Sequence, residues 1–436
     1  MAAFKKSYVL LRTLQKNGTP NLKTSFVSRR TQSCDRYMAL EKKHCANIYD
    51  SMKVVICRGQ GTKVWDVDGN EYLDFLAGYA AVNTGHCHPK ILQCLREQAG
   101  TLTHTSRAVY NSELPQFAEY ITRYFNYDKV IPMNTGVEGG DTAIKIARRW
   151  GYLTKGIPEN QAIVVMVTSN FWGRSLAALS SSTNPAVYEH FGPFMPGFGL
   201  VPFNNIEALE EAFCNPNVCA FMVEPILGEG GVVVPCDRYL AQVRSLCTEK
   251  NVLWIADEVQ TGLGRTGQLL AVDHDCVRPD ILILGKGLAG GFLPMSAVLA
   301  NDDVMCHMTP GVHGSTFGGN PLASKVAVKT LEVIQEECLA ENAKKMGERF
   351  REDLVCKVPK DVVTQIRGRG LMNAISVNTE CGKASEFTAR MRALGLMAKA
   401  NDDVTIRLTP PLTITEEEIC KAVDIIAEVV HSMKKN

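Results

Sequence analysis

The sequence predicts an α/β protein: a large domain with a mainly parallel sheet, covered by helices on both faces, and then a smaller α+β domain. From about residue 130 to 300, short apolar runs rich in β-branched residues alternate with segments of helical pattern. The runs at 163–167, 220–223, 252–256 and 281–284 are apolar throughout. Such strands are typical of a parallel sheet with both faces buried. After about residue 330, a long helix, two strands and further helices indicate a second domain.

The composition is that of an ordinary globular protein and argues against several function classes. The chain has 436 residues, 45% hydrophobic and 21% charged, enough for two or three domains. Its 47 Lys and Arg residues are balanced by 46 Asp and Glu residues, so no positive excess favours nucleic acid. No apolar run is long enough to cross a bilayer. The fifteen cysteines include no C-x-x-C pair, which favours reduced thiols in an intracellular compartment.

The first 34 residues differ in composition from the rest. They contain seven Lys and Arg residues, many Ser and Thr residues, and no acidic residue before Asp35. This is typical of a mitochondrial presequence, and the continuous apolar core of a secretory signal is missing. We therefore expect 1–34 to direct the protein to the mitochondrial matrix. The alternative is a disordered basic tail on a cytoplasmic protein.

The remaining chain is divided into an N-terminal segment with a β-hairpin at 35–80, the large domain at 81–330 and the small domain at 331–436. The turn at 68–70 predicts the hairpin. In the C-terminal part, the pattern predicts one long helix over 324–354.

The last helix, over 415–433, has a clear start signal. Thr415 and Glu418 have the spacing of a capping box, in which each side chain accepts a hydrogen bond from the other residue's backbone N–H. A strand over 405–408 precedes it.

Lys286 is the first candidate functional residue. It follows the strand 281–284 and lies between two glycines. A lysine held in apolar surroundings is less stable as a cation, so its pKa falls and its amine becomes a nucleophile. The alternative is a surface lysine just beyond a strand.

Asp257 lies at the end of the strand 252–256, as Glu224 follows 220–223. Ligands of parallel sheets bind at the carboxyl ends of the strands. An amine and a carboxylate on two strand ends can contact a flat ligand from two sides. Pyridoxal phosphate needs both, because its aldehyde bonds to a lysine and its ring nitrogen pairs with a carboxylate. Taken alone, an Asp at a strand end is more often structural.

The segment 134–141 offers a phosphate site. It is rich in glycine and opens a helix, where free N–H groups and the helix dipole favour an anion. A simple glycine-rich helix start is the alternative.

Three other patterns are weaker. Gly262–Gly267 fits G-x-G-x-x-G, but five residues separate it from the strand, and no acidic residue follows at the distance that a dinucleotide site needs. Gly285-Lys286-Gly287 lacks the spacing of a P-loop. His86-Cys87-His88 has no second ligand cluster at zinc-like spacing, so we expect no metal.

Several motifs together resemble those of class III pyridoxal-phosphate aminotransferases. They are, in chain order, Gly85–Pro89, Asn134–Glu138, Asp257–Gly262, Lys286 after its apolar strand, and Gly314–Pro321. The resemblance extends from about residue 40 to the end. It implies the fold type I architecture of pyridoxal-phosphate-dependent transferases, with pyridoxal 5′-phosphate as cofactor.

The resemblance also implies roles for single residues. Lys286 would bond to the cofactor and then carry a proton, and Asp257 would keep the ring nitrogen protonated. The remaining cofactor contacts would be Gln260 at the phenolic oxygen, Phe171 stacked on the ring, Gly136 and Val137 at the phosphate, and Thr316 at the phosphate from a partner subunit. The last contact implies a homodimer with shared active sites.

Within the class, segments 171–176, 191–198, 224–231 and 407–411 most resemble members that act on ornithine. The implied reaction transfers the δ-amino group of L-ornithine to 2-oxoglutarate and gives glutamate 5-semialdehyde and glutamate. The alternatives are an acetylornithine or 4-aminobutyrate aminotransferase, or a scaffold homologue without cofactor.

The implied substrate contacts are five. Arg174 and Arg407 would bind the two carboxylates of 2-oxoglutarate in bidentate pairs. Glu229 would neutralise Arg407 while ornithine is bound. Tyr49 and Tyr79 would orient the α-end of ornithine.

Overall fold

The computed structural model describes residues 34–434. Residues 1–33 of the predicted presequence lie outside the described residues. The chain forms two units, one of residues 34–57 and 66–70 and the other of residues 58–65 and 71–434.

The first unit contains α1 (Cys34–His44) and the turn 66–70. Asp66 closes this turn, because its Oδ1 atom accepts hydrogen bonds from the N–H groups of Asp68 (3.0 Å) and Asn70 (2.8 Å). The turn predicted for the hairpin is therefore confirmed.

The second unit is built on a seven-stranded sheet of order β4-β10-β9-β8-β7-β5-β6. Only β10 is antiparallel to its neighbours, which confirms a mainly parallel sheet. The strands are β4 (Lys129–Met133), β5 (Ile163–Val167), β6 (Phe198–Val201), β7 (Val218–Val223), β8 (Leu253–Asp257), β9 (Ile281–Leu284) and β10 (Ser296–Ala300).

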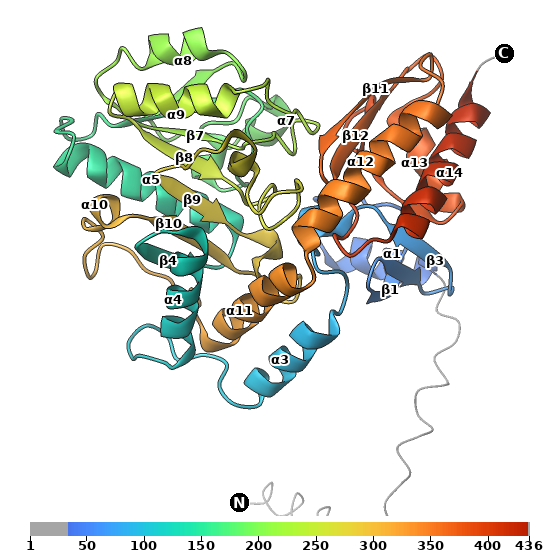
Figure 1. The fold of residues 1–436 in the computed structure, drawn as a ribbon, viewed down its shortest axis with the longest axis horizontal. Helices are drawn as coiled ribbons and strands as arrows, with labels where there is room; N and C mark the ends of the chain where they lie inside the picture. The colour runs from blue at the N-terminus through green and yellow to red at the C-terminus, as the bar shows by residue number, and fades with distance from the viewer. Residues whose placement is uncertain (1–33, 435–436) are drawn as a thin grey trace, which may run out of the picture. The chain divides into compact units, whose positions relative to one another are not determined.

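Both faces of this sheet are buried, as the apolar runs predict. Successive residues of a strand point to opposite faces, and here they join two different cores. Trp254 and Leu282 pack in the core that includes α9, whereas Ile255 and Ile283 pack in the core that includes α5. Figure 1 shows the helices around the sheet. Those of the large domain are α3 (Pro89–Ala99), α4 (Glu113–Phe125), α5 (Gly136–Leu153), α8 (Ile206–Ala212), α9 (Tyr239–Glu249) and α11 (Pro321–Glu336).

Short helical turns connect the larger elements. They are α2 (Ala77–Ala80), α6 (Leu176–Leu179), α7 (Pro185–Tyr188), η1 (Ala271–Asp275), η2 (Lys286–Ala289) and α10 (Asp302–Met305).

The single helix predicted over 324–354 is wrong, because two helices occupy this range: α11 and α12 (Leu339–Lys357). Cys338 separates them in the left-handed region, with φ 50°. The break redirects the chain, since α11 packs against α3 and α4 while α12 packs against α14. Neither glycine nor proline marks it.

The C-terminal part has a four-stranded antiparallel sheet of order β11-β12-β15-β14, beside which Figure 1 shows α12, α13 and α14. Its elements are β11 (Val363–Arg369), β12 (Met372–Val377), α13 (Ala384–Ala393), β14 (Lys399–Ala400), β15 (Thr405–Leu408) and α14 (Glu416–Met433). The predicted capping box of Thr415 and Glu418 is confirmed. A third sheet, β1-β2-β3-β13, is formed by β1 (Ile56–Gln60), β2 (Lys63–Asp66), β3 (Glu71–Asp74) and β13 (Leu396–Met397). Within residues 34–434, no helix combines the length and the apolar character that a bilayer span requires.

Candidate active site

Three ionisable side chains follow neighbouring strands of the large sheet. Glu224 comes directly after β7, Asp257 ends β8, and Lys286 comes two residues after β9. Because β7, β8 and β9 are adjacent and parallel, their carboxyl ends lie at one edge of the sheet. The structure therefore brings these three residues to the edge where ligands of such sheets bind.

Lys286 begins η2 with a φ of 44°, in the left-handed region. For a residue other than glycine, such a backbone costs about 1–3 kcal/mol, and residues of this kind are often found at functional sites. Burial, assisted by the charge of Arg407, lowers the pKa of the amine, although Glu229 opposes the shift. Within residues 34–434, the amine has no hydrogen bond or ion pair. It has the properties of a nucleophile.

Asp257 is 5% exposed. Its Oδ1 atom accepts a hydrogen bond from the Val259 N–H group (3.0 Å), and its other oxygen has no hydrogen-bond partner in the described part of the chain. Burial raises the pKa of Asp257 to about 6. A cationic ligand atom at the free oxygen would favour the ionised carboxylate.

The N-terminus of α5 offers unpaired donors at the same edge. Thr135 and Glu138 form a reciprocal capping box there, which leaves the N–H groups of Gly136 and Val137 without a hydrogen-bond partner among the described residues. Val259, two residues after Asp257, lies so close to Gly136 that a Cβ atom there would be 2.9 Å from its Cγ1 atom. These N–H groups and the dipole of an 18-residue helix suit an anion.

Arg407 is held at the same site by two side chains and is 2% exposed. Its Nη1 atom pairs with Glu229 Oε1 (2.5 Å), and its Nη2 atom donates to Gln260 Oε1 (2.9 Å). Burial opposes ionisation of Glu229, but the charge and hydrogen bond of Arg407 outweigh it, so the pKa of Glu229 is lowered. The Gln260 side chain fits only because residue 228 is glycine: a Cβ atom there would be 2.2 Å from Gln260 Oε1.

Tyr79 lies next to Arg407, whose guanidinium carbon is 5.4 Å from the centre of the Tyr79 ring. Tyr79 is part of α2, in which four successive residues have a positive φ: Ala77, Gly78, Tyr79 and Ala80. Asp74 supports this left-handed turn, because its Oδ1 atom accepts hydrogen bonds from the N–H groups of Leu76 (2.8 Å) and Ala77 (2.9 Å).

A cavity of about 550 Å³ connects several predicted residues. Phe171, Arg174, Glu229 and Asn401 are among the residues that line it. The Arg174 guanidinium carbon lies 5.7 Å from the centre of the Phe171 ring. The lining of this cavity therefore includes an exposed arginine and the carboxylate that pairs with Arg407, and both can contact a small charged ligand.

The chain matches the family "Aminotransferase class-III" over residues 44–430. It is a class III aminotransferase. Enzymes of this family depend on pyridoxal phosphate. The groups on the sheet edge fit this cofactor: a buried amine of lowered pKa, a carboxylate oxygen without a partner, and unpaired N–H groups at a helix start.

Three known aminotransferases illustrate the similarity. The mitochondrial ornithine aminotransferase of Drosophila melanogaster is 56% identical to the chain over 395 residues, 91% of each protein. The structure of ornithine aminotransferase from Toxoplasma gondii matches with a TM-score of 0.91 and 45% identity, covering 92% of this chain and 96% of that one. The acetylornithine aminotransferase of Elizabethkingia anophelis is also 45% identical, with a TM-score of 0.83 and coverage of 92% and 100%. At equal identity, the structure of this class III aminotransferase is more similar to the ornithine enzyme than to the acetylornithine enzyme.

Two predicted residues are not placed in this group of contacts. Tyr49 is 75% exposed and belongs to the first unit, which is described by itself. Thr316 is exposed, in a loop that the neighbouring Ser315 anchors, since Asn134 Nδ2 donates to Ser315 Oγ (3.0 Å). The side chain of Thr316 is therefore available for contacts outside its own chain.

Two further residues of this aminotransferase contact the site, although neither was assigned a role there from the sequence. Glu224 accepts hydrogen bonds from the N–H groups of Phe171 (3.1 Å) and Gly228 (3.1 Å). Burial, together with the nearby Asp257, raises the pKa of Glu224. Asn401 donates from Nδ2 to the backbone oxygen of Glu229 (3.1 Å). A strand-end position was the signal for Glu224, whereas no sequence signal indicated Asn401.

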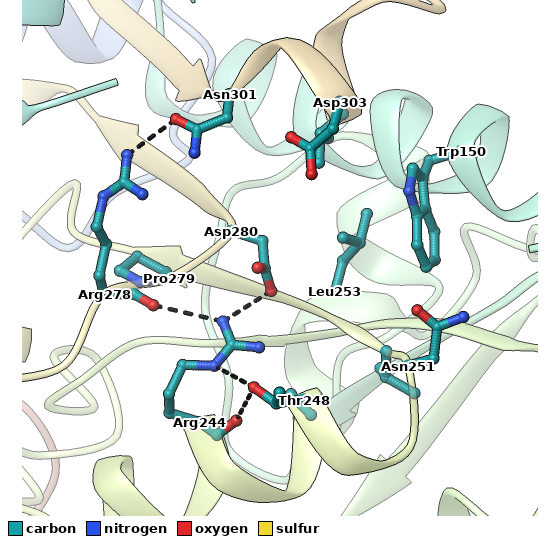
Figure 2. A pocket seen from close by; sticks show the side chains of 13 residues that line it. Trp150, Arg244, Thr248, Asn251, Leu253, Arg278, Pro279, Asp280, Asn301 and Asp303 are labelled. Carbon is teal, nitrogen blue, oxygen red and sulfur yellow. Dashed lines mark hydrogen bonds and ion pairs between the residues drawn. The ribbon is translucent and has the colours of Figure 1, made fainter. Parts of the chain in front are cut away.

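A second cavity, of about 390 Å³, lies at the amino ends of β8 and β9. Figure 2 shows hydrogen bonds made by both of its arginines. Arg244 Nη1 donates to Asp280 Oδ2 (2.8 Å), and Arg278 Nη2 donates to Asn301 Oδ1 (2.9 Å). This cavity is remote from the carboxyl ends of the strands, where ligands of such sheets bind.

Glu258, next to Asp257, allows a test of how the pKa of a buried carboxyl group changes stability with pH. Its carboxylate accepts hydrogen bonds from the Val272 N–H group (2.9 Å) and the Thr261 hydroxyl, and burial raises its pKa to about 7. From about pH 4.5 to 7 the folded protein therefore binds more protons than the unfolded chain, and stability falls as pH rises.

Glu258→Gln keeps the shape and removes this titration. Between pH 5.5 and 8.5, we expect wild type to lose on the order of 2 kcal/mol more stability than the variant. Chemical denaturation at both pH values measures this difference. Equal losses in the two proteins would show that Glu258 does not titrate in this range.

Proposed function

We propose that this chain transfers the δ-amino group of L-ornithine to 2-oxoglutarate, giving glutamate 5-semialdehyde and glutamate. The observation that carries the proposal is the ion pair of the buried Arg407 with the half-buried Glu229, both close enough to Lys286 to affect its pKa. A site that takes two substrates in turn needs two charge states, because ornithine has one carboxylate and 2-oxoglutarate has two. Identity to ornithine aminotransferases supports the same assignment.

When bound, pyridoxal phosphate supplies an aldehyde that carries the amino group and a protonated ring that withdraws electrons. Lys286 Nζ would hold the cofactor through its aldehyde. When a substrate amine takes its place, the Lys286 amine would accept a proton from the substrate carbon that carries the amino group and later donate it. Its lowered pKa suits both steps.

The other cofactor contacts hold the ring in place. Asp257 would keep the ring nitrogen protonated, and Gln260 would donate a hydrogen bond to the phenolic oxygen. Phe171 would stack on the ring. The N–H groups of Gly136 and Val137 would bind the phosphate, which their lack of other partners supports.

Charge pairing explains the choice between the two substrates. While ornithine is bound, Glu229 cancels the charge of Arg407, and the α-carboxylate is oriented by Tyr79 and Tyr49. When 2-oxoglutarate enters, Arg407 leaves Glu229 and binds one carboxylate, and Arg174 binds the other. The contact of Arg407 with Tyr79 and the cavity at Arg174 support this arrangement. The role of Tyr49 is supported by the sequence resemblance alone.

The function is tested by comparing three amines with 2-oxoglutarate as acceptor. We expect kcat/KM to be highest for ornithine, with glutamate 5-semialdehyde as product, and lower for N-acetylornithine and 4-aminobutyrate. A higher value for either of the other amines would assign the chain to that activity instead. A purified protein that does not bind the cofactor would support the scaffold alternative.

Glu229→Ala tests the charge pair. Without Glu229, Arg407 is free to bind the α-carboxylate of any amino acid, so we expect the preference for the δ-amine over the α-amine to fall at least about tenfold. The ratio of the two oxo products from ornithine measures it. Glu249→Ala, which removes an exposed carboxylate paired with Lys250, is the control. An unchanged product ratio in Glu229→Ala would remove the charge-pair model.

We further propose a homodimer in which Thr316 of each subunit binds the phosphate of the other. The exposure of Thr316 next to the anchored Ser315 supports it. Sedimentation of the holoenzyme would give the mass of a dimer, and a monomer with full activity would contradict the proposal.

Delivery to the mitochondrial matrix by residues 1–34 is proposed from their composition, and a similar enzyme named as mitochondrial supports it. A fluorescent reporter carrying these residues would enter mitochondria, whereas a diffuse cytoplasmic signal would contradict the proposal. We also propose the division of the remaining chain into an N-terminal segment at 35–80, a large domain at 81–330 and a small domain at 331–436.

A further inference from the structure

Arg265 is a fully buried cation that the proposed reaction does not use. It is 0% exposed, and burial lowers the pKa of its guanidinium to about 9. Its hydrogen bonds go only to neutral oxygens: Nη1 donates to the backbone oxygens of Leu371 (3.0 Å) and Pro410, and Nη2 donates to Asn83 Oδ1 (2.7 Å). Burying a charge without a carboxylate partner is costly, so its position calls for an explanation.

The two backbone acceptors lie next to the strand that carries Arg407 and next to the strand paired with it. Leu371 directly precedes β12, and Pro410 comes two residues after β15. These strands are paired, with Ala374 opposite Arg407. Arg265 therefore holds the start of one strand and the exit of the other.

Arg265 is also connected to the site through its own loop. Gln260, five residues earlier, accepts a hydrogen bond from Arg407 Nη2 (2.9 Å). The loop after β8 is thus fastened to the β15 segment at two points: Gln260 binds Arg407, and Arg265 binds Pro410. Residues 260–265 and 407–410 therefore form a closed loop of contacts that includes Arg407.

The glycine-rich pattern 262–267 serves this close packing. Gly264 and Gly267 have φ values of 87° and 89°. A Cβ atom on Gly370 would lie 2.3 Å from the backbone carbon of Thr266, so the two backbones are in direct contact. The pattern that resembles a dinucleotide motif is here a packing surface for the C-terminal domain.

We propose that Arg265 is a positioning residue that keeps Arg407 in place when Arg407 leaves Glu229 to bind the dicarboxylic oxo acid. The inference rests on the proposed function. While Arg407 is paired, Glu229, Gln260 and Arg265 all hold the β15 segment. Once the pair opens, the contact with Glu229 is lost, and a larger share of the restraint falls on Gln260 and on the hydrogen bonds of Arg265.

Arg265→Lys tests this role, because a single ammonium group cannot reach all three acceptors in the geometry of the guanidinium. The two half-reactions are measured separately on the holoenzyme by the absorbance of the bound cofactor, with ornithine and then with 2-oxoglutarate. We expect the apparent Kd for 2-oxoglutarate to rise about tenfold, while the constants for ornithine change less than about threefold.

Arg351→Lys is the matched control. Arg351 Nη1 donates to the backbone oxygen of Gly370 (3.0 Å) and to Asn373 Oδ1 (2.8 Å), so it braces the same turn from α12 without contacting Pro410. We expect no difference between its half-reactions. Equal losses in both half-reactions of Arg265→Lys, or the same selective loss in Arg351→Lys, would overturn the proposal.

Asn83→Ala provides a milder variant where Arg265→Lys does not fold. It removes one acceptor and leaves the Nη1 hydrogen bonds, so the same selective loss is expected at smaller amplitude; no selectivity would overturn the proposal. Arg407→Lys separates this inference from the proposed function. If 2-oxoglutarate binding is unchanged in Arg407→Lys, the assignment of Arg407 as a carboxylate-binding residue is wrong. If it weakens there while Arg265→Lys and Asn83→Ala show no selectivity, only the role of Arg265 is wrong.

Discussion

Lys286→Ala is expected to lower the rate of amino transfer by about 10⁴-fold or more, because the variant loses the covalent bond to the cofactor and the group that moves the proton. Both functions need an amine that is neutral part of the time. Burial supplies this by lowering the pKa of Lys286, and the strained backbone at φ 44° fixes where the amine begins. Single-turnover rates with ornithine measure the loss, and the absorbance of lysine-bound cofactor should be absent.

Lys155→Ala is a suitable control for this variant. Burial also lowers the pKa of Lys155, but its amine donates to the backbone oxygens of Val218 and Asn251 (both 2.7 Å), at the amino ends of β7 and β8. It should retain the rate of wild type at temperatures where it is folded. Turnover by Lys286→Ala within tenfold of wild type would refute the assignment of the lysine.

The part of the site that follows from the sheet could be predicted from the sequence. Uninterrupted apolar runs identify strands buried on both faces, and a polar residue that follows such a run is placed at the ligand edge whatever the rest of the fold. Asp257 and Lys286 were identified in this way, and both lie at that edge. The helix start at Gly136 has its own local signal in its glycines, and the structure adds a capping box of Thr135 and Glu138.

Contacts between residues far apart in the chain could not be predicted in the same way. Arg265 is bonded to Pro410, and Asn401 to Glu229, and neither pair has a local pattern. The break at Cys338 was missed because local helical pattern continues through it, and only packing of α11 and α12 against different partners requires the turn. Glu224 had the strand-end signal, but its hydrogen bonds to the N–H groups of Phe171 and Gly228 depend on loop conformations.

Asp257→Asn is expected to lower the rate of amino transfer by roughly 10²–10⁴-fold, since breaking a buried ion pair costs about 3–5 kcal/mol. The asparagine Oδ1 atom can still accept from the Val259 N–H group, as Asp257 does. The other position, however, becomes an NH₂ donor in place of an anion. The ring nitrogen then has no carboxylate to keep it protonated, and the ring withdraws electrons less well.

Glu258→Gln is the matched control for Asp257→Asn, because it removes a neighbouring buried carboxylate that the proposed cofactor site does not use. Residues 257 and 258 are adjacent, both are buried, and burial raises the pKa of both, yet Glu258 is bonded to Thr261 and Val272 within the protein. Both variants remove one buried carboxylate, so a loss caused by general damage to the loop would appear in each. We expect only Asp257→Asn to lose activity, measured as single-turnover rates at a fixed pH with saturating cofactor. A rate within tenfold of wild type would mean that the carboxylate of Asp257 does not face the ring nitrogen, and the position of the cofactor on this sheet edge would have to be reassigned.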